Sequence, residues 1–275
     1  MNTKAKKSPP PSTTGWCLAY LPLAGILIAT ATPSVAHAAY ELRNGAVAEL
    51  RQGNPNTIFN GNLCLVGNMP ANSSVKIMRT VLQFDLSSIA AGAEISSLSL
   101  QMTVGNTGGS TNATSAATDI GSFFLYALVP SGSNNNLFSE TDATWNNWGA
   151  GDAKKWTTPG GDFSSLVKLS EAVVPATGAL TNGAKYTFAS TAEFVSVAQT
   201  ALNNGLPIQL IIISETAEQL TSGQGFIRFA SNDHATENWR PLLTINATSI
   251  PEPGTNAMIT SALALVIVLG LRRFR

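Results

Sequence analysis

The stretch Ser97-Leu98-Ser99-Leu100-Gln101-Met102-Thr103-Val104 decides the fold class. Its apolar side chains occupy every second position and alternate with polar ones. Because successive side chains of a β-strand point to opposite faces, this period of two predicts a strand with one buried face. The stretch therefore predicts a sheet that covers a core on one side.

Other runs rich in β-forming residues lie before and after this strand. Strands are predicted at Ala46–Leu50, Lys76–Phe84, Phe123–Leu128, Leu166–Val174, Lys185–Phe188, Ile208–Ser214, Gly225–Ala230 and Leu242–Asn246. Polar, turn-rich stretches such as residues 105–118 and 130–136 separate them. Many short strands joined by Asn-, Ser-, Thr- and Gly-rich loops predict an all-β fold of the β-sandwich or jelly-roll class.

One segment departs from this pattern and predicts a short packed α-helix over about residues 190–203. Ser190 and Glu193 have the spacing of a capping box, and Asn203-Asn204-Gly205 ends the turn. One face of the segment carries the apolar residues Phe194, Val197, Ala198, Ala201 and Leu202. We expect the helix to pack across one end or edge of the sandwich, in a structural role.

Residues 1–38 predict a signal peptide. Lys4, Lys6 and Lys7 form a basic start without acidic residues, and a nearly continuous apolar or small run follows over residues 16–31. Ala36-His37-Ala38 then places small residues at both positions that a signal peptidase reads. Cleavage is therefore predicted after Ala38.

A first membrane helix is the alternative interpretation of the same segment. Pro22 and Pro33 interrupt the apolar run, and a cleavage site follows it closely, which favours the signal peptide. Cys17 is then removed with it. No lipobox precedes this cysteine, so a lipoprotein anchor is not expected.

The other end of the chain predicts a hydrophobic anchor. Residues 256–271 are uncharged and mostly aliphatic, and the chain ends on Arg272-Arg273-Phe274-Arg275. About 16 residues at ~1.5 Å rise give ~24 Å, against a bilayer core of ~30 Å, so the transmembrane helix is a marginal span. Arg272, Arg273 and Arg275 form a membrane stop on the cytoplasmic side, which places the chain between the two hydrophobic segments outside the cytoplasm.

Pro251-Glu252-Pro253 stands immediately before this apolar segment. Its two prolines keep the junction extended and accessible beside the membrane. A Pro-Glu-Pro motif, an apolar helix and an arginine cluster in this order resemble the bacterial PEP-CTERM sorting signal, over residues 251–275. The resemblance implies that an exosortase removes the anchor after transient attachment to the inner membrane. It also implies a destination at the cell surface or in the biofilm matrix of a Gram-negative bacterium that makes extracellular polysaccharide.

The segment between these signals, residues 39–250, fits one all-β domain. A chain of this length buries a sizeable core without disulfides. Cys64 is its only cysteine, so no internal disulfide can form. A lone cysteine in an oxidising compartment is either buried or pairs with another chain, and the strand-like run of Leu63 and Leu65 around it favours burial.

Loss of the two terminal segments makes the domain acidic. They contain six of the 16 basic residues and only one, Glu252, of the 16 acidic residues, so the net charge falls from zero to about −5. Phosphate binding needs a basic surface. The composition therefore argues against a nucleic-acid partner.

Short motifs along this domain resemble a DNRLRE-type domain. They are Leu50-Arg51-Gln52-Gly53, Pro55-Asn56-Thr57, the run from Arg79 through Phe84-Asp85-Leu86 to Ile89, Thr144-Trp145-Asn146, Phe229-Ala230-Ser231 and Arg240-Pro241-Leu242-Leu243, in the expected order. Such domains are β-sandwiches of secreted proteins, and some are carbohydrate-binding modules of polysaccharide-active enzymes. The resemblance departs at Val47-Ala48-Glu49-Leu50-Arg51, which lacks the expected aspartate.

Two of these motifs carry structural expectations. Arg79 and Phe84-Asp85-Leu86 suit a strand that enters a tight Ser-Ser turn. Arg240-Pro241 suits the opening of a last edge strand, where a missing N–H is tolerated.

The domain has few residues of the types that catalyse reactions or bind zinc. His234 and Cys64 are the only histidine and cysteine left after processing, which excludes an ordinary zinc site. A Ser-His-Asp triad would have to use His234, but no Gly-x-Ser-x-Gly elbow accompanies it. We interpret His234 as a solvated loop residue and expect no catalytic residue, metal or cofactor.

Acidic residues leave two weaker alternatives. Asp142, Asp152, Asp162 and Glu215 are among the carboxylates that a glycosidase would use, but nearly every protein meets that requirement. The three aspartates could also supply oxygens to calcium, although no EF-hand spacing is present. Solvated loop acids are the expected outcome.

Trp145, Trp148 and Trp156 stand close together in a Gly-, Asp-, Asn- and Thr-rich stretch. Indoles on loops stack on sugar rings while nearby amides and carboxylates bond the hydroxyls. This predicts a candidate carbohydrate-binding site, with Trp148 and Trp156 the better candidates. Alternatively, Trp145 belongs to the core, as its place at a strand end in the resembled family implies, and the other two cover an open sandwich end.

Two functions follow as expectations. The first is a non-catalytic structural or adhesive component associated with exopolysaccharide, and the second is a specific carbohydrate-binding module. A polysaccharide-active enzyme is a distant third. Exposed, coplanar tryptophans would favour specific binding, whereas buried indoles would favour the structural role.

Overall fold

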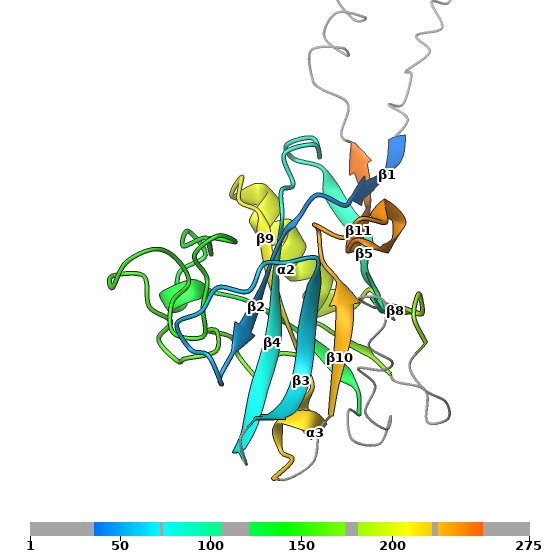
Figure 1. The fold of residues 1–275 in the computed structure, drawn as a ribbon. Helices are drawn as coiled ribbons and strands as arrows, with labels where there is room; N and C mark the ends of the chain where they lie inside the picture. Colours follow the sequence, from blue (N-terminus) through cyan, green and yellow to red (C-terminus); the bar gives the residue numbers. More distant parts are fainter. Residues whose placement is uncertain (1–35, 72–73, 106–120, 174–180, 222–224, 250–275) are drawn as a thin grey trace, which may run out of the picture. The chain divides into compact units, whose positions relative to one another are not determined.

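The computed structural model describes residues 36–71, 74–105, 121–173, 181–221 and 225–249 (Figure 1). They form two antiparallel sheets. Sheet A has the order β1 (Ala36–Leu42), β11 (Leu242–Ser249), β5 (Glu94–Thr103) and β8 (Lys185–Phe188). Sheet B has the order β10 (Gly225–Ala230), β3 (Leu63–Ala71), β4 (Ser74–Phe84), β9 (Ile208–Ile213), β6 (Phe123–Ala127) and β7 (Ser170–Ala172), and β2 (Ala46–Arg51) pairs with β4. The all-β prediction is confirmed.

The alternation that predicted the first strand has the expected structural basis. Leu98, Leu100 and Met102 of β5 are at most 2 % exposed, and the polar residues between them are half-buried. Residues of both sheets share one apolar core, for example Leu100 and Phe188 of sheet A with Leu82 and Phe229 of sheet B. The two sheets therefore face one another in a sandwich-like arrangement.

The expected helix forms as α2 (Ala192–Asn203). It places Phe194, Ala198 and Leu202 in the core shared by the two sheets, and it contacts β5 and β9. Its N-cap is Thr191 and not Ser190, because the Thr191 hydroxyl accepts from Phe194 N at 3.0 Å. The capping box placed at Ser190 is therefore wrong by one residue.

Short helical segments complete the described secondary structure. The four-residue helix α3 (Glu215–Glu218), capped by Ser214, follows β9 and was not predicted. Two single-turn 3₁₀ segments, η1 (Pro130–Gly132) and η2 (Glu237–Trp239), lie in loops.

Two strand predictions need correction, and strands β1 and β3 were not among the predicted strands. In place of the strand over residues 166–174, only Ser170–Ala172 pairs, because Val167 N donates to Ser164 O in a turn and Leu166 is 93 % exposed. Strand β11 lies between β1 and β5, so Arg240-Pro241 does not open an edge strand. Strand β1 was missed because its first residues were assigned to the signal peptide.

Sheet B is buried on both faces. All six residues of β9 are buried: alternate ones face the inter-sheet core, while Ile211 and Ile213 pack into a second apolar cluster on the outer face. The chain from residue 128 to residue 169 supplies the cover for that outer face, and we call it the loop layer (Figure 1, green). A segment rich in polar residues therefore acts as a third layer.

The predicted addressing segments lie outside the described residues. They are the signal peptide up to residue 35, the sorting motif Pro251, Glu252 and Pro253, and the membrane stop Arg272, Arg273 and Arg275. Among the helices that are described, none has the length and apolar composition needed to cross a bilayer. The transmembrane helix and the proposed domain boundaries remain predictions.

Candidate functional site

Two of the three tryptophans singled out by sequence are core residues. Trp145 is 7 % exposed and Trp156 is 4 % exposed, and both pack into the cluster under the loop layer. The Trp156 indole donates from Nε1 to Thr144 O at 2.8 Å, so its polar atom is also satisfied inside. The core assignment of Trp145 is confirmed. For Trp156 the burial favours the alternative in which the indole covers an apolar face, here the outer face of sheet B, over exposed stacking on a sugar.

Trp148 is the tryptophan of this group that keeps access to solvent. Its ring is half-buried, Lys154 Nζ lies 5.5 Å from the ring centroid, and its Nε1 donates to Ser131 Oγ at 3.0 Å. These two contacts orient the indole, and the exposed part of its ring leaves apolar surface on which a sugar ring can stack. Trp148 therefore remains a candidate, without a second exposed indole beside it in this group.

Ser131 lies in a turn of the loop layer that several hydrogen bonds hold in place. It adopts the left-handed region at φ 49° and ψ 34°, a conformation that costs a non-glycine residue roughly 1 kcal/mol. Ser131 N donates to Asp162 at 2.6 Å, and Ser131 Oγ donates to Lys155 O at 2.7 Å. Together with the bond from Trp148, these contacts hold the turn in one shape.

Asp162 ties three points of the loop layer together. Besides Ser131 N, its carboxylate accepts from Thr157 N at 2.9 Å and from Thr158 N at 2.8 Å. A carboxylate that accepts several backbone N–H bonds is a structural anchor. Asp162 is therefore not a freely solvated acid, whereas the side chain of Asp152 is 96 % exposed, as expected.

An open hollow of about 500 Å³ lies beside this anchor. Its walls include the hydroxyls of Thr157, Thr158 and Ser164 together with the half-buried ring of Phe163. Hydroxyl groups both donate and accept, so this surface can bond the hydroxyls of a polar ligand, and Arg79 and Asp162 are the charged residues among its lining. Val129 and Gly132 of the lining flank Ser131, to which Trp148 donates its hydrogen bond.

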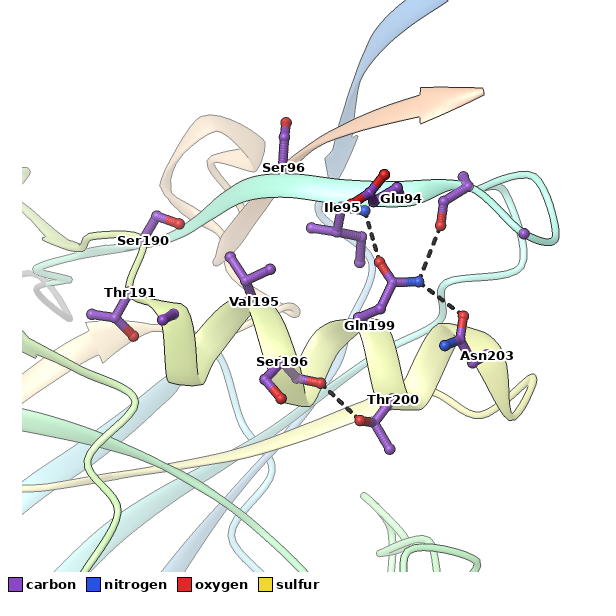
Figure 2. A pocket seen from close by; sticks show the side chains of 13 residues that line it. Glu94, Ile95, Ser96, Ser190, Thr191, Val195, Ser196, Gln199, Thr200 and Asn203 are labelled. Atoms are coloured by element: carbon purple, nitrogen blue, oxygen red, sulfur yellow. Dashed lines mark hydrogen bonds between the residues drawn. The ribbon is translucent and has the colours of Figure 1, made fainter. Parts of the chain in front are cut away.

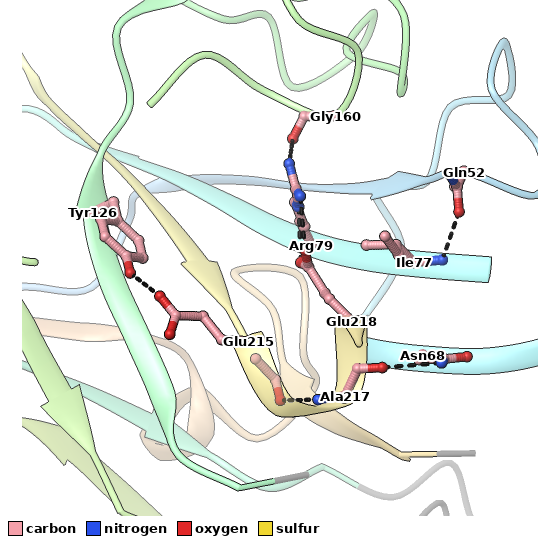
Figure 3. A network of polar contacts seen from close by, with 10 residues as sticks. Gln52, Asn68, Ile77, Arg79, Tyr126, Gly160, Glu215, Ala217 and Glu218 are labelled. Atoms are coloured by element: carbon pink, nitrogen blue, oxygen red, sulfur yellow. Dashed lines mark hydrogen bonds and ion pairs between the residues drawn. The ribbon is translucent and has the colours of Figure 1, made fainter. Parts of the chain in front are cut away.

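Arg79 is one of the residues that line the hollow, and it joins three elements (Figure 3 shows its polar contacts). From β4 its Nε and Nη2 donate to the Glu218 carboxylate of α3 at 2.8 and 2.7 Å, and its Nη1 donates to Gly160 O at 3.0 Å. The guanidinium also lies 5.1 Å from the Phe163 ring and 5.4 Å from the Trp145 ring. Arg79 thus lies mid-strand under the loop layer, before the turn in which Asp85 accepts from Ser87 N at 2.9 Å.

Gly160 is required where the loop layer meets Trp145. Its φ is +93°, and an added Cβ would stand 2.6 Å from the indole, which is too close for any side chain. In the sequence, the Gly160-Gly161 pair indicates a tight turn or a close approach of the backbone. This signal was not used to predict the contact with Trp145.

Glu215, one of the carboxylates considered for glycoside hydrolysis, is engaged on both oxygens. Tyr126 OH donates to Oε1, and Lys168 Nζ lies 3.2 Å from Oε2 (Figure 3 shows the Tyr126 contact). Burial, together with this bond, raises the pKa of Tyr126. The arrangement is that of a structural network joining β6 to α3.

The interpretation of His234 as a solvated loop residue is wrong, and the predicted burial of Cys64 is confirmed. His234 is 8 % exposed because its ring stacks on Trp239 at 5.1 Å, with 16° between the planes, and its Nδ1 accepts from Thr236 N. Cys64 is 1 % exposed, and burial raises the pKa of its thiol to about 12. Both side chains serve packing.

Metal binding and family membership complete the account of the site. Within the described part of the chain, no three side chains of His, Cys, Asp or Glu come together closely enough to hold a metal ion. No protein-family model matches the chain, and no curated protein matches its sequence. The PEP-CTERM and DNRLRE resemblances remain predictions from the residues.

Proposed function

We propose that the protein is exported and serves, without catalysis, as a structural or adhesive component of the cell surface or biofilm matrix, in association with exopolysaccharide. The order of Pro251-Glu252-Pro253, an apolar segment and an arginine cluster carries this proposal. Signal peptidase and an exosortase are the processing partners, and membrane anchoring is transient.

The pairing of the first and last strands supports this mode of attachment. Ala36 lies opposite Ser249 in the antiparallel β1–β11 ladder, so the two ends of the described body lie side by side. Pro251 follows β11 after a single intervening residue.

Cleavage after Ala38 is compatible with the sheet. It removes three of the seven residue pairs of the β1–β11 ladder, and it keeps those of Ala39, Tyr40, Glu41 and Leu42. The mature chain thus retains a β1 strand that covers the edge of β11.

The finer fold assignment is a β-sandwich related to DNRLRE domains. Residues of separate motifs meet in space: Arg79 lies 5.4 Å from the Trp145 ring, and Leu50 packs into the same cluster as Trp145. Contact between motif residues far apart in the chain is what a shared fold requires.

A carbohydrate-binding module is the second candidate, favoured by one observation. Trp148, the preorganised Ser131 turn and the hydroxyl-lined hollow adjoin one another on the loop layer. A test is retention on the organism's own polysaccharide. Trp148→Ala should weaken retention while the buried Trp156 stays intact, and equal retention would exclude Trp148.

The main proposal is tested by the intact mass of the extracellular protein. We expect a chain that begins at Ala39 and lacks Phe274 and Arg275. A mass that still includes both C-terminal residues would show that the anchor is not removed.

A further inference from the structure

A second groove lies away from the loop layer, between α2 and the first half of β5. Strand β8 pairs only with Leu100–Thr103 of β5, so α2 lies beside residues 94–98 in place of a strand. An open groove of about 860 Å³ lies over α2 and this part of β5, within the size range of ligand sites.

The walls of this groove are fixed by side chains that replace strand pairing (Figure 2). Gln199 of α2 accepts from Ile95 N at 2.7 Å and donates to Ala93 O at 3.0 Å. Ser190 Oγ accepts from Leu98 N at 3.2 Å. Because these bonds satisfy the edge of β5, the groove keeps its width without a bound strand, and binding in it needs little reorganisation.

The lining of the groove is rich in groups that both donate and accept hydrogen bonds. The hydroxyl and amide residues that line it are Ser96, Ser190, Thr191, Ser196, Gln199, Thr200 and Asn203. Thr191, Gln199 and Thr200 already donate to other groups of the chain. The Ser190 hydroxyl only accepts, from Leu98 N, and the described contacts leave the Ser196 hydroxyl and the Asn203 amide nitrogen unbonded, so these groups remain for the hydroxyls of a sugar chain. The class of ligand that fits is a hydroxyl-rich polymer.

The charge of the lining residues narrows the class of polymer that fits the groove. Glu94 is the only charged residue among those that line the groove, and Glu193 lies in the first turn of α2 beside it. With one carboxylate and no cation in the lining, an anionic chain such as a polyuronate would meet repulsion. We infer that this groove binds a neutral polysaccharide, which rests on the proposed association with exopolysaccharide and names its site and ligand class.

The groove also predicts how strong the contact is. No aromatic residue is among its lining residues, so the stacking that strengthens many sugar sites is absent there. A contact made by hydrogen bonds alone is weak for one chain. It becomes effective through many copies on one polymer, which suits a matrix component.

The test is affinity electrophoresis of the full chain in mild detergent, through gels that contain dextran, galactomannan or alginate. The variant Ser196→Arg/Thr200→Arg fills the groove from two exposed positions of α2, where arginine is a good helix former. The matched control is Thr181→Arg/Asn182→Arg, which adds the same charge at two exposed positions outside the lining.

We expect retardation by at least one neutral polymer and not by alginate. Losing a few hydrogen bonds should weaken binding about tenfold in the groove variant and leave the control unchanged. Equal retardation of the groove variant and the wild type would overturn this site while leaving the proposed function intact. Retardation by alginate alone, or by no polymer, would overturn the inference, whereas export is tested separately by localisation.

Discussion

Arg79 of β4 and Glu218 of α3 form a two-point ion pair across 139 positions of sequence, with N–O distances of 2.8 and 2.7 Å. Their side chains are only 13 % and 12 % exposed. The same guanidinium also holds the carbonyl of Gly160, so one side chain fixes a strand, a helix and the loop layer together. The ion pair and the apolar cluster beneath the loop layer thus both hold this layer on sheet B.

Arg79→Ala should therefore be strongly destabilising. It leaves the mostly buried Glu218 carboxylate without its partner, which costs up to about 3–5 kcal/mol. Urea unfolding followed by circular dichroism measures the free energy of unfolding. Lys155→Ala is the control, because it breaks an exposed pair with Asp152 and should cost at most about 1 kcal/mol. Equal effects of the two variants would contradict the role assigned to Arg79.

Trp156→Ala tests the loop layer as a third layer of the fold. Removal of a buried indole should cost about 3–5 kcal/mol, whereas Trp148→Ala, at a half-buried ring, should cost clearly less. Thermal unfolding of both variants gives the comparison. If Trp156→Ala unfolds at the wild-type temperature, the outer face of sheet B does not depend on this cover.

Cys64 should be inert in the folded protein. Its thiol is buried, and with a pKa of about 12 almost none of it is the reactive thiolate at neutral pH. We expect a maleimide reagent to label Cys64 in denaturant and to leave it unlabelled in native buffer, as measured by mass spectrometry. Rapid labelling of the native chain would show that β3 and β10 open readily.

Glu49 gives a pH dependence with a definite sign. Burial, as the largest effect, raises its pKa above the ordinary value of 4.5 despite bonds from Arg51 and Leu65 N. The folded state then holds this proton more tightly than the unfolded state, so the Glu49 contribution becomes less favourable as the pH rises from 4.5 through the raised pKa.

Glu49→Gln should remove this dependence. Relative to the wild type, the variant should gain stability between acidic and neutral pH, which urea unfolding at several pH values measures. A difference between the two proteins that does not change with pH would contradict the raised pKa.

The strands were predictable where a pattern within a few consecutive residues indicates which face of the strand is buried. The alternation of β5 and the apolar run of β9 lie in a few consecutive residues, and Lys185–Phe188 and Gly225–Ala230 form with the expected bounds. The cap of α2 was placed one residue early because Ser190 and Thr191 are both good caps. In the structure Ser190 Oγ accepts from Leu98 N of β5, and Thr191 Oγ1 accepts from Phe194 N of the helix.

The candidate sites were less predictable because their contacts are distant in sequence. The residues around Trp156 do not indicate that its ring packs in one cluster with Ile211 and Ile213 on the outer face of β9, which are more than 50 positions away in sequence. His234 was misplaced for the same reason, since its burial depends on stacking with Trp239. The groove beside β5 arises from where β8 stops pairing, which is a property of the sheet and not of any one segment.

Export is the central claim, and a reporter enzyme fused after Ile250 tests it most directly. The reporter must be one that is active only outside the cytoplasm. We expect full activity in intact cells, and loss of that activity when residues 1–38 are deleted. A fusion that is expressed and stays in the cytosol would contradict the account.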